Sequence, residues 1–437
     1  MMVTTKPSSI AWIGNIPADW DIKKIKYIST LKGRIGWQGL TSDEYTDEGA
    51  YLITGTDFYN GGINWETCVH VPMKRWDEAK DIQIANGDLL ITKDGTVGKV
   101  AIVNGLNSPC SLNSGVLRIS TANGYDRKFL YWVLQSEVFW TWFSIKNAGN
   151  STILHLYQGD FAEFNYAIPT LPEQQAIAAF LDNRCGQIDV IVADLERQVE
   201  ILRQYKKALI TETVTKGLDK TAPMKGSGID WIGEMPRHWE MKRLKFLGSA
   251  RNGLTYAPED VVDEDKGTLV LRSSNIQNDR LTFDDNVYVN CRIPKEIVLQ
   301  ENDLLICSRN GSQALIGKCA LIDEKTAGQT YGAFMCVYRS RYNKFIHYVF
   351  LSDIFSYYLG TFLTSTVNQL TNLNLYNIQI PIPMDLNEQQ AIVEFLDHKC
   401  AEVDDLIAEK QKAAETMRQY KKSLIYEYVT GKKRVTG

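Results

Sequence analysis

Apolar residues recur at every seventh position in two long stretches of this chain, which are its most regular pattern. In the first stretch the repeating column consists of Leu181, Ile188, Leu195, Leu202 and Leu209. In the second stretch the column contains Leu396, Val403, Met417 and Leu424. A seven-residue spacing held over several heptads predicts a long helix with one apolar stripe. Lys410 falls in the second column, where its aliphatic stem can lie along the seam while the charge stays in water.

Both predicted helices carry start and stop signals. Capping-box spacing at the starts is found in the pairs Thr170 with Glu173 and Asn387 with Gln390. Gly217 and Gly431 stand where the helices should end. Each helix is then about 40 residues, or roughly 60 Å, long.

The two stretches are copies of one another. Residues 173–177 (Glu-Gln-Gln-Ala-Ile) return at 388–392, and residues 203–207 (Arg-Gln-Tyr-Lys-Lys) return at 418–422, both 215 positions later. Tyr205 and Tyr420 belong to the second of these runs. A helix of this length needs a partner for its apolar stripe, and its own duplicate is the economical choice. Because a globular block separates the copies, we predict an antiparallel pair with a pseudo-twofold axis. The alternative is two unrelated helices, each packed on its own domain.

A second repeat precedes each globular block. Residues 10–28 and 229–247, which we call the lead-in segments, share the pattern Ile-x-Trp-Ile-Gly-x-x-Pro-x-x-Trp followed by a lysine-rich stretch, 219 positions apart. Stacking of these tryptophans on nucleic-acid bases is conceivable, but a packed structural role fits the pattern better. The Asn-Gly pairs and short apolar runs of the blocks indicate strands and hairpins. Each block closes with an aromatic helical stretch, near 129–143 and 345–362, so we predict duplicated α+β domains with curved sheets.

Composition excludes several classes of protein. The 437 residues have a formal charge of −4 and are 44% hydrophobic and 23% charged, which is typical of a globular protein. No signal peptide or membrane-spanning run is evident, so a cytoplasmic location is expected. The eight cysteines include no Cys-x-x-Cys pair, which argues against zinc ribbons and disulfide frameworks. Cys185 and Cys400 lie on the helical stripe and are expected to be core thiols.

No catalytic constellation is evident. The segments that end in Lys99 and Lys318 lack the spacing of a nucleotide-binding loop, but a hairpin lysine facing a DNA phosphate remains possible. The five histidines are scattered, so a metal site has little support. Basic clusters occur, for example at 23–26 and 242–245, although such clusters are usually solvated surface.

The combination of motifs resembles the specificity (S) subunit of type I restriction-modification enzymes. The resemblance is carried by Ile-Pro-x-x-x-Glu-Gln-Gln-x-Ile at 168–177, by the similar run at 382–392, and by the hairpins at 87–99 and 302–318. It covers essentially the whole chain. One departure is Asn302, which stands where the first copy has Gly87, and the second hairpin is longer.

What the resemblance implies is a non-catalytic DNA reader. Residues 1–170 and 219–386 would be target recognition domains, and 171–218 and 387–437 would be conserved spacer helices. The reader would bind double-stranded DNA and direct adenine methylation and restriction by partner subunits. Two methyltransferase (M) subunits would supply S-adenosylmethionine, and restriction (R) subunits would use ATP and Mg, so that no cofactor resides in this chain.

Physical reasoning adds constraints on the DNA site. Readers at the ends of a spacer of roughly 60 Å would cover roughly 15 to 20 base pairs. Because the two blocks differ in sequence, the two half-sites should not be palindromic. The candidate contacts are polar loop residues, which favour phosphate positioning and base-edge readout. In the first block they are Thr54, Thr56, Lys93, Asp94, Thr96, Lys99, Asn113 and Ser114. In the second block they are Ser273, Asn275, Arg309, Asn310, Ser312, Gln313, Lys318 and Tyr331.

Two other functions stay open at this point. One is a structural coiled-coil adapter that bridges proteins without touching DNA. The other is a stand-alone nucleic-acid enzyme, such as a nuclease on a duplicated scaffold, which would need an acidic metal cluster.

Overall fold

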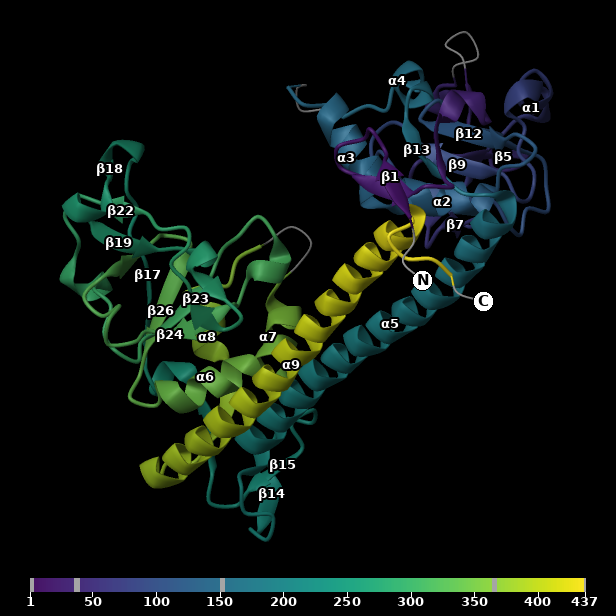
Figure 1. The fold of residues 1–437 in the computed structure, drawn as a ribbon. Coiled ribbons are helices and arrows are strands. Elements are labelled where there is room, and N and C mark those ends of the chain that lie inside the picture. The colour runs from purple at the N-terminus through teal and green to yellow at the C-terminus, as the bar shows by residue number, and fades with distance from the viewer. Residues whose placement is uncertain (1–3, 35–39, 150–153, 364–367, 436–437) are drawn as a thin grey trace. The chain divides into compact units, whose positions relative to one another are not determined.

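The chain folds into two compact units in a computed structural model that describes residues 4–34, 40–149, 154–363 and 368–435. Unit 1 comprises residues 1–195 and 412–437, and unit 2 comprises residues 196–411. The two long helices, α5 (Leu171–Lys216) and α9 (Leu386–Val429), each contribute one end to each unit (Figure 1). Gly217 and Gly431 follow them with φ of +71° and +70°, which confirms the predicted stops.

In unit 1 the helices run antiparallel. Phe180 of α5 packs on Tyr428 of α9 with ring centroids 4.4 Å apart. Further along α5, Asp189 accepts a hydrogen bond from Lys421, with 2.6 Å between Lys421 Nζ and Asp189 Oδ1. Residue numbers therefore rise along α5 as they fall along α9. In Figure 1 the last turns of α9 lie beside the start of α5.

In unit 2 the equivalent pair occurs with the copies exchanged. Lys206 of α5 donates to Asp404 of α9 at 2.7 Å. Lys206 corresponds to Lys421 and Asp404 to Asp189, each 215 positions apart. This reciprocity is expected of duplicated helices that pair antiparallel, and it confirms the predicted partner for each apolar stripe.

The heptad column is buried over most of its length. Its fully buried members are Leu181, Ile188, Leu396, Val403 and Leu424, and the half-buried members are Leu195, Leu202, Leu209 and Met417. Tyr205 and Tyr420 are 54% and 52% exposed, so they flank the seam and leave their rings in solvent.

The predicted capping boxes are not formed, because their side chains bond elsewhere. The Glu173 carboxylate accepts from Trp20 Nε1 at 3.2 Å, and Glu388 accepts from Trp239 Nε1 at 2.8 Å. Gln390 donates to Glu394. Both tryptophans are fully buried. The repeated helices and the repeated lead-in segments are thus connected: a glutamate at the start of each long helix bonds the tryptophan of one lead-in segment.

Unit 1 is built on a four-stranded antiparallel sheet and a three-stranded sheet. The first has the order β10 (Val100–Ile102), β9 (Leu89–Thr92), β12 (Val116–Thr121), β4 (Ser29–Gly33). The second has the order β11 (Cys110–Leu112), β5 (Ala50–Ile53), β8 (Val69–Val71), with β11 parallel to β5. Smaller pairs are β1 (Thr5–Pro7) with β2 (Asn15–Pro17), β3 (Asp21–Lys24) with β13 (Asn165–Ile168), and β6 (Phe58–Tyr59) with β7 (Gly62–Ile63). The short helices are α1 (Met73–Asp77), α2 (Arg127–Gln135), α3 (Glu137–Lys146) and α4 (Gln158–Ala162).

Unit 2 repeats this plan with an extra strand. Its main sheet has the order β17 (Ser249–Asn252), β26 (Met335–Arg339), β23 (Leu304–Cys307), β24 (Cys319–Leu321). The second sheet has the order β18 (Val261–Val262), β22 (Tyr288–Val289), β19 (Thr268–Leu271), β25 (Thr330–Tyr331), with β19 parallel to β25. The pairs are β14 (Met224–Gly226) with β15 (Glu234–Pro236), β16 (Glu240–Arg243) with β27 (Gln379–Ile382), and β20 (Ile276–Gln277) with β21 (Arg280–Leu281). Its helices are α6 (Asn343–Leu351), α7 (Asp353–Phe362) and α8 (Asn372–Asn377).

Each predicted aromatic helical stretch is two helices. Ser136 caps α3 by accepting from the amide of Val138, and Ser352 caps α7 by accepting from the amide of Ile354. A serine that bonds the backbone ahead of it starts a new helix and changes the direction of the chain.

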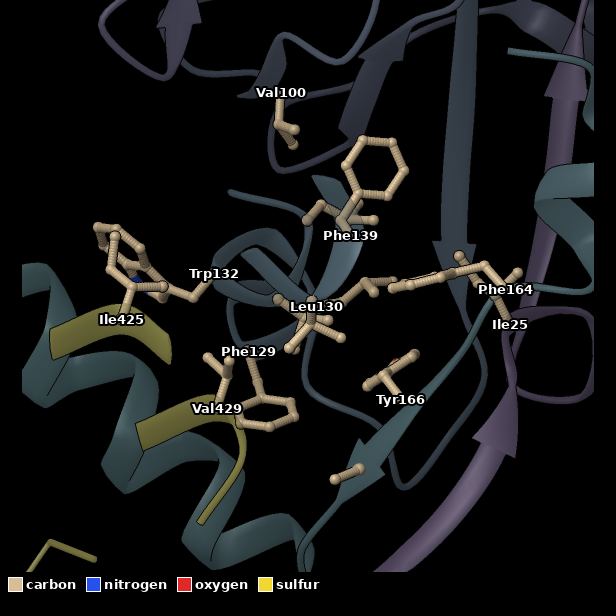
Figure 2. Packing of buried hydrophobic residues seen from close by; sticks show 14 of the residues in the cluster. Ile25, Val100, Phe129, Leu130, Trp132, Phe139, Phe164, Tyr166, Ile425 and Val429 are labelled. Carbon is tan, nitrogen blue, oxygen red and sulfur yellow. The ribbon is translucent and has the colours of Figure 1, made fainter. Parts of the chain in front are cut away.

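The core of unit 1 joins its helices to the main sheet. Phe129, Trp132 and Phe139 of α2 and α3 share one buried cluster with Ile425 and Val429 of α9 (Figure 2). In unit 2, Ile210 and Val214 of α5 enter the corresponding cluster, together with helices α6 and α7. Each block therefore rests on the long helices through its own core.

Candidate nucleic-acid interface

The candidate residues of the first block meet where three strands end. Strand β5 leads into Thr54 and Thr56, β9 into Lys93, and β11 into Asn113. The amide of Asn113 donates to Ile53 O at 2.9 Å, and the amide of Lys93 donates to Gly115 O at 2.8 Å. The sheets thus bring three loops from distant parts of the sequence to one edge.

The loop after β5 is held by a buried carboxylate. Asp57 Oδ2 accepts from the amide of Thr54 at 2.7 Å and from its hydroxyl at 2.9 Å. The Thr54 hydroxyl is also 2.7 Å from that of Thr56, and Thr56 is exposed. Two threonine hydroxyls are therefore presented on a rigid loop.

The turn between β9 and β10 is a closed hairpin whose tip is exposed. Thr92 Oγ1 donates to Thr96 O and accepts from the amide of Lys99 at 2.9 Å. The exposed Lys99 ammonium reaches back to Gly55 O at 3.4 Å. In this position Lys99 connects the hairpin with the loop after β5, and it retains donors for an external acceptor because an ammonium has three.

Two further candidates occupy the same edge. The Asp94 carboxylate contacts the imidazole of His155, whose ring also packs on Tyr157 with centroids 4.3 Å apart. Ser114 is exposed beside Asn113, at 3.2 Å between Ser114 Oγ and Asn113 Oδ1. The structure thus brings all eight first-block candidates together.

In the second block, the loops after β19 and β23 meet in the same way. Asn310 Nδ2 donates to Ser273 Oγ at 3.2 Å, and Asn310 Oδ1 accepts from the amide of Ser312 at 3.0 Å. Ser312 and Gln313 are exposed. Lys318 Nζ reaches Ile276 O at 3.4 Å, which is the counterpart of the contact made by Lys99.

Arg309 is the most exposed cation of this edge and sits on an aromatic ring. Its guanidinium lies 5.4 Å from the ring centroid of Phe334, which is itself 60% exposed. The amide of Arg309 donates to Phe334 O at 3.0 Å. Stacking on a ring orients the planar fork of an arginine, which is the group that reads guanine edges bidentately.

Two second-block candidates are buried. Asn275 has no exposed surface, and its side chain bonds the amide of Arg272 at 2.9 Å and Thr282 O at 3.0 Å. Tyr331 is 1% exposed, and its hydroxyl donates to Arg251 O at 3.2 Å. Neither side chain faces solvent. Because their hydrogen bonds are internal, both side chains position the loops.

The sequence did not single out the aromatic surroundings of these loops. In unit 1 a slot of about 340 Å³ beside Lys99 is lined by Tyr59, Gln135 and Trp140, among others. Trp140 lies against Gly98, so a glycine is required there for close approach. The sequence shows a Gly-Lys pair before a strand, but the aromatic neighbours of this pair come from strand β6 and helix α3, both about 40 residues away in the sequence.

The described residues contain no group of three or more His, Cys, Asp or Glu side chains placed to hold a metal ion. Burial raises the pKa of Cys185 to about 12 and that of Cys400 to about 11, as expected of core thiols. None of the helices in the described ranges combines the length and apolarity needed to cross a membrane.

The duplicated blocks, their paired helices and the polar loop edges define a two-block recognition scaffold. Comparison with known proteins assigns the class: the chain belongs to the family described as "Type I restriction modification DNA specificity domain", which matches residues 17–201 and 236–416. The predicted resemblance is thereby confirmed.

Individual relatives agree with this assignment. The chain is 26% identical to the type I restriction enzyme MjaVIII specificity subunit of Methanocaldococcus jannaschii over 96% of this chain and 94% of that protein. It is 27% identical to the EcoKI specificity subunit of Escherichia coli over 71% of this chain and 65% of that protein. A solved chain from work on complex assembly and conformational transition of the type I R-M system has the same fold. It shows a TM-score of 0.70 and 17% identity, covering 95% of this chain and 99% of that one.

Proposed function

We propose that this chain is the DNA-reading subunit of a type I restriction-modification complex and that it has no catalytic role of its own. Each polar loop edge reads one half of a bipartite, non-palindromic sequence in double-stranded DNA. Methyltransferase and restriction subunits bind the chain, carry S-adenosylmethionine, ATP and Mg, and perform adenine methylation and cleavage.

The proposal is supported by one contrast: the two loop edges share the same backbone frame, but their exposed side chains differ. In both blocks, three loops meet at one edge. In both blocks a lysine ammonium also reaches a backbone carbonyl across this edge: Lys99 contacts Gly55 O and Lys318 contacts Ile276 O. Around this common frame the exposed side chains differ, since the first block presents Thr56 and the second presents Arg309. A common frame with different contacts is what a reader of two unlike half-sites needs.

The contacts divide by chemistry. Lys99 and Lys318 are point charges suited to phosphate oxygens, which position the duplex without reading it. Arg309, Ser312 and Gln313 carry directional donors and acceptors suited to base edges. These groups lie on loops held at the ends of strands, and a rigid element positions a side chain more precisely than a free loop does.

The test is to map methylated adenines in cells that carry this chain with its methyltransferase partner. The expected result is methylation at one bipartite sequence with two unlike halves, which disappears when this chain is deleted. Purified chain and methyltransferase should also bind duplex DNA in a salt-sensitive manner.

Two results would reject the proposal. Absence of salt-sensitive DNA binding with and without the methyltransferase would favour a structural adapter. Cleavage or methyl transfer by the purified chain alone would favour a stand-alone enzyme.

A further inference from the structure

A slot in unit 1 adjoins the proposed reading edge of block 1. It measures about 340 Å³, and its lining residues come from the β6–β7 hairpin, the start of β10 and the helices α2 and α3. Phe58, Tyr59, Lys99, Gln135 and Trp140 supply the larger side chains of its wall. This volume is within the range of pockets that enclose a small organic ligand. We call it the aromatic slot.

The rings of the aromatic slot differ in how the chain holds them. Trp140 is half-buried, and its ring lies edge-on against those of Phe139 and Phe143, with centroids 5.5 and 6.0 Å apart. Tyr59 is 68% exposed. Internal packing therefore orients Trp140 but does not require a ring at Tyr59, where a polar side chain would satisfy the fold equally well. An exposed ring beside a positioned one is suited to stacking on a flat ligand.

The polar groups of the slot complement a nucleobase. Lys99 Nζ lies 3.4 Å from Gly55 O in the loop after β5, so the same ammonium borders the slot and the proposed reading edge. Gln135 adds an amide, which both donates and accepts hydrogen bonds. Of the described residues that line the slot, none is an aspartate or a glutamate. The slot therefore favours a flat ligand with carbonyl oxygens, such as thymine.

Block 2 contains the same hairpin. Asp57 Oδ2 accepts from the amide three residues earlier at 2.7 Å, and Asn275 Oδ1 accepts from the amide three residues earlier at 2.9 Å. Residues 60–61 and 278–279 then form the turns, each with two consecutive left-handed residues. The two hairpins are therefore equivalent, 218 positions apart.

The rings are missing from block 2, although its hairpin lysine is kept. Gln277 stands at the position of Tyr59. The capping serines of α3 and α7 are 216 positions apart, so Ser356 stands at the position of Trp140. The corresponding hollow of unit 2, of about 820 Å³, has charged lining residues that include Lys206, Asp279, Arg280 and Asp404. The aromatic slot is thus particular to block 1.

The proposed function supplies a ligand of the required chemistry. A methyltransferase cannot reach an adenine amino group inside the stacked duplex, so the adenine leaves the stack. The thymine opposite is then unpaired, and it presents a flat ring and acceptor oxygens. Tyr59 follows Thr56 of the proposed reading edge by three residues, which brings the slot next to DNA bound at that edge.

We infer that the aromatic slot holds the thymine that is left unpaired when the adenine opposite it leaves the duplex for methylation, in the half-site read by block 1. The thymine stacks on Tyr59 and Trp140, and Lys99 lies beside its carbonyl oxygens. The inference rests on the proposed function for the DNA and for the extruded adenine. It gives block 1 a second task, the stabilisation of opened DNA, that block 2 does not share.

The test is a double-mutant cycle between the slot and the DNA. It uses the full chain with its methyltransferase partner, the duplex identified by methylation mapping, and S-adenosylhomocysteine, which has no methyl group to transfer. Alanine at residues 54, 56, 96 and 114 first identifies the half-site that block 1 reads. In one duplex, an abasic nucleotide then replaces the thymine opposite the methylated adenine of that half-site.

Tyr59→Ala should weaken binding of the intact duplex by about ten-fold, as the loss of one stacked base does. The same variant should have little further effect on the abasic duplex, because the base that Tyr59 contacts is already missing. An abasic nucleotide in the other half-site should leave the effect of Tyr59→Ala unchanged. Tyr59→Phe retains the ring and should bind like the parent.

Matched controls remove rings of similar exposure that lie beside lysines elsewhere. Tyr27 and Phe246 are 70% and 71% exposed, and their ring centroids lie 5.2 Å from the Lys26 ammonium and 4.8 Å from the Lys245 ammonium. Tyr27→Ala and Phe246→Ala should act equally on the intact and the abasic duplex. Thermal unfolding of every variant should match the parent, because exposed rings contribute little to the core.

The outcomes separate this inference from the proposed function. If Tyr59→Ala leaves binding of the intact duplex unchanged, or weakens both duplexes equally, the slot does not hold this thymine and the proposed function stands. A half-site of block 1 without a methylated adenine would also overturn the inference alone. If the parent complex shows no salt-sensitive binding of DNA, both fall.

Discussion

Individual side chains show how far a residue's role depends on its neighbours. Lys99 and Arg309 are both cations at a proposed reading edge, but Lys99 bonds a backbone carbonyl across two loops whereas Arg309 lies on the ring of Phe334. A lysine ammonium is a point charge that contacts phosphate without directional preference, whereas an oriented guanidinium can discriminate bases. Their replacement should therefore have different consequences.

Lys99→Ala should weaken binding to all duplexes to a similar extent and lower the salt slope by about 1, as the loss of one phosphate contact does. Arg309→Ala should cost about 1 to 3 kcal/mol on the cognate sequence and relax preference at one base position. Competition binding against half-site variants measures both. Lys74→Ala and Arg292→Ala serve as controls on exposed cations outside the loops. Unchanged affinity in both loop variants would remove these loops from the proposed interface.

His347 of α6 provides a prediction about pH. Burial lowers the pKa of its imidazole from 6.5 to about 4, and the charge of Lys206 acts in the same direction. Below pH 6.5 the unfolded chain binds a proton at this residue that the folded chain does not. Stability should therefore rise with pH between about 4 and 6.5 and level off above, with His347 contributing up to about 3 kcal/mol to the change.

The measurement is urea unfolding at pH 4.5 and pH 7 for the parent and for His347→Gln. The variant should lose less stability than the parent on acidification, because its side chain does not titrate. An equal loss in both proteins would show that His347 is protonated in the fold.

At the scale of secondary structure, the long helices are held by reciprocal ion pairs as well as by their apolar stripe. Lys206 with Asp404 is the less exposed pair, with side-chain exposures of 21% and 37%. Lys421 with Asp189 is more exposed, at 24% and 60%. Water and salt screen an ion pair more strongly as its exposure increases, so the two equivalent pairs should differ in energy.

Double-mutant cycles with alanine should give a coupling of about 0.2 to 1 kcal/mol for each pair, with the larger value for Lys206 and Asp404. Urea unfolding in low and high salt provides the measurement, and both couplings should shrink in high salt. The pair Lys399 and Glu402, exposed on one face of α9, serves as a control within one helix. A larger coupling for the more exposed pair would contradict this account.

At the scale of the whole molecule, each unit has its own core and its own proposed reading edge. The strands that lead into the candidate loops of block 1 bury Ile53 and Leu112 in one cluster, and those of block 2 bury Leu271 and Cys307 in another. A substitution in one set of loops is therefore not expected to rearrange the other set. Independence of this kind fits the proposal that the two halves of one DNA sequence are read separately.

Alanine at residues 309, 310, 312 and 313 together should relax one half of the methylated sequence, and alanine at 54, 56, 96 and 114 should relax the other half. Sequencing of methylated sites in cells that express each variant provides the measurement. Relaxation of both halves by either variant would show that the units are coupled.

The sequence by itself determined the duplication, the two long helices and the family, since all three depend on patterns local to the chain. The heptad column needed no tertiary knowledge, because a seven-residue period is set by helix geometry. The stops at Gly217 and Gly431 were equally local. The predicted capping box of Thr170 and Glu173 did not form, because the Glu173 carboxylate bonds Trp20 and Arg434, which lie far away in the sequence.

Only the tertiary structure decided which polar residues face outward. Asn275 and Tyr331 carry polar side chains as the exposed candidates do, but they are buried and their hydrogen bonds are internal. Likewise, no local pattern shows that Arg309 lies on Phe334, or that Tyr27 and Phe246 remain exposed beside lysines. Exposure results from which loops the sheet brings together, and that depends on contacts between residues many positions apart.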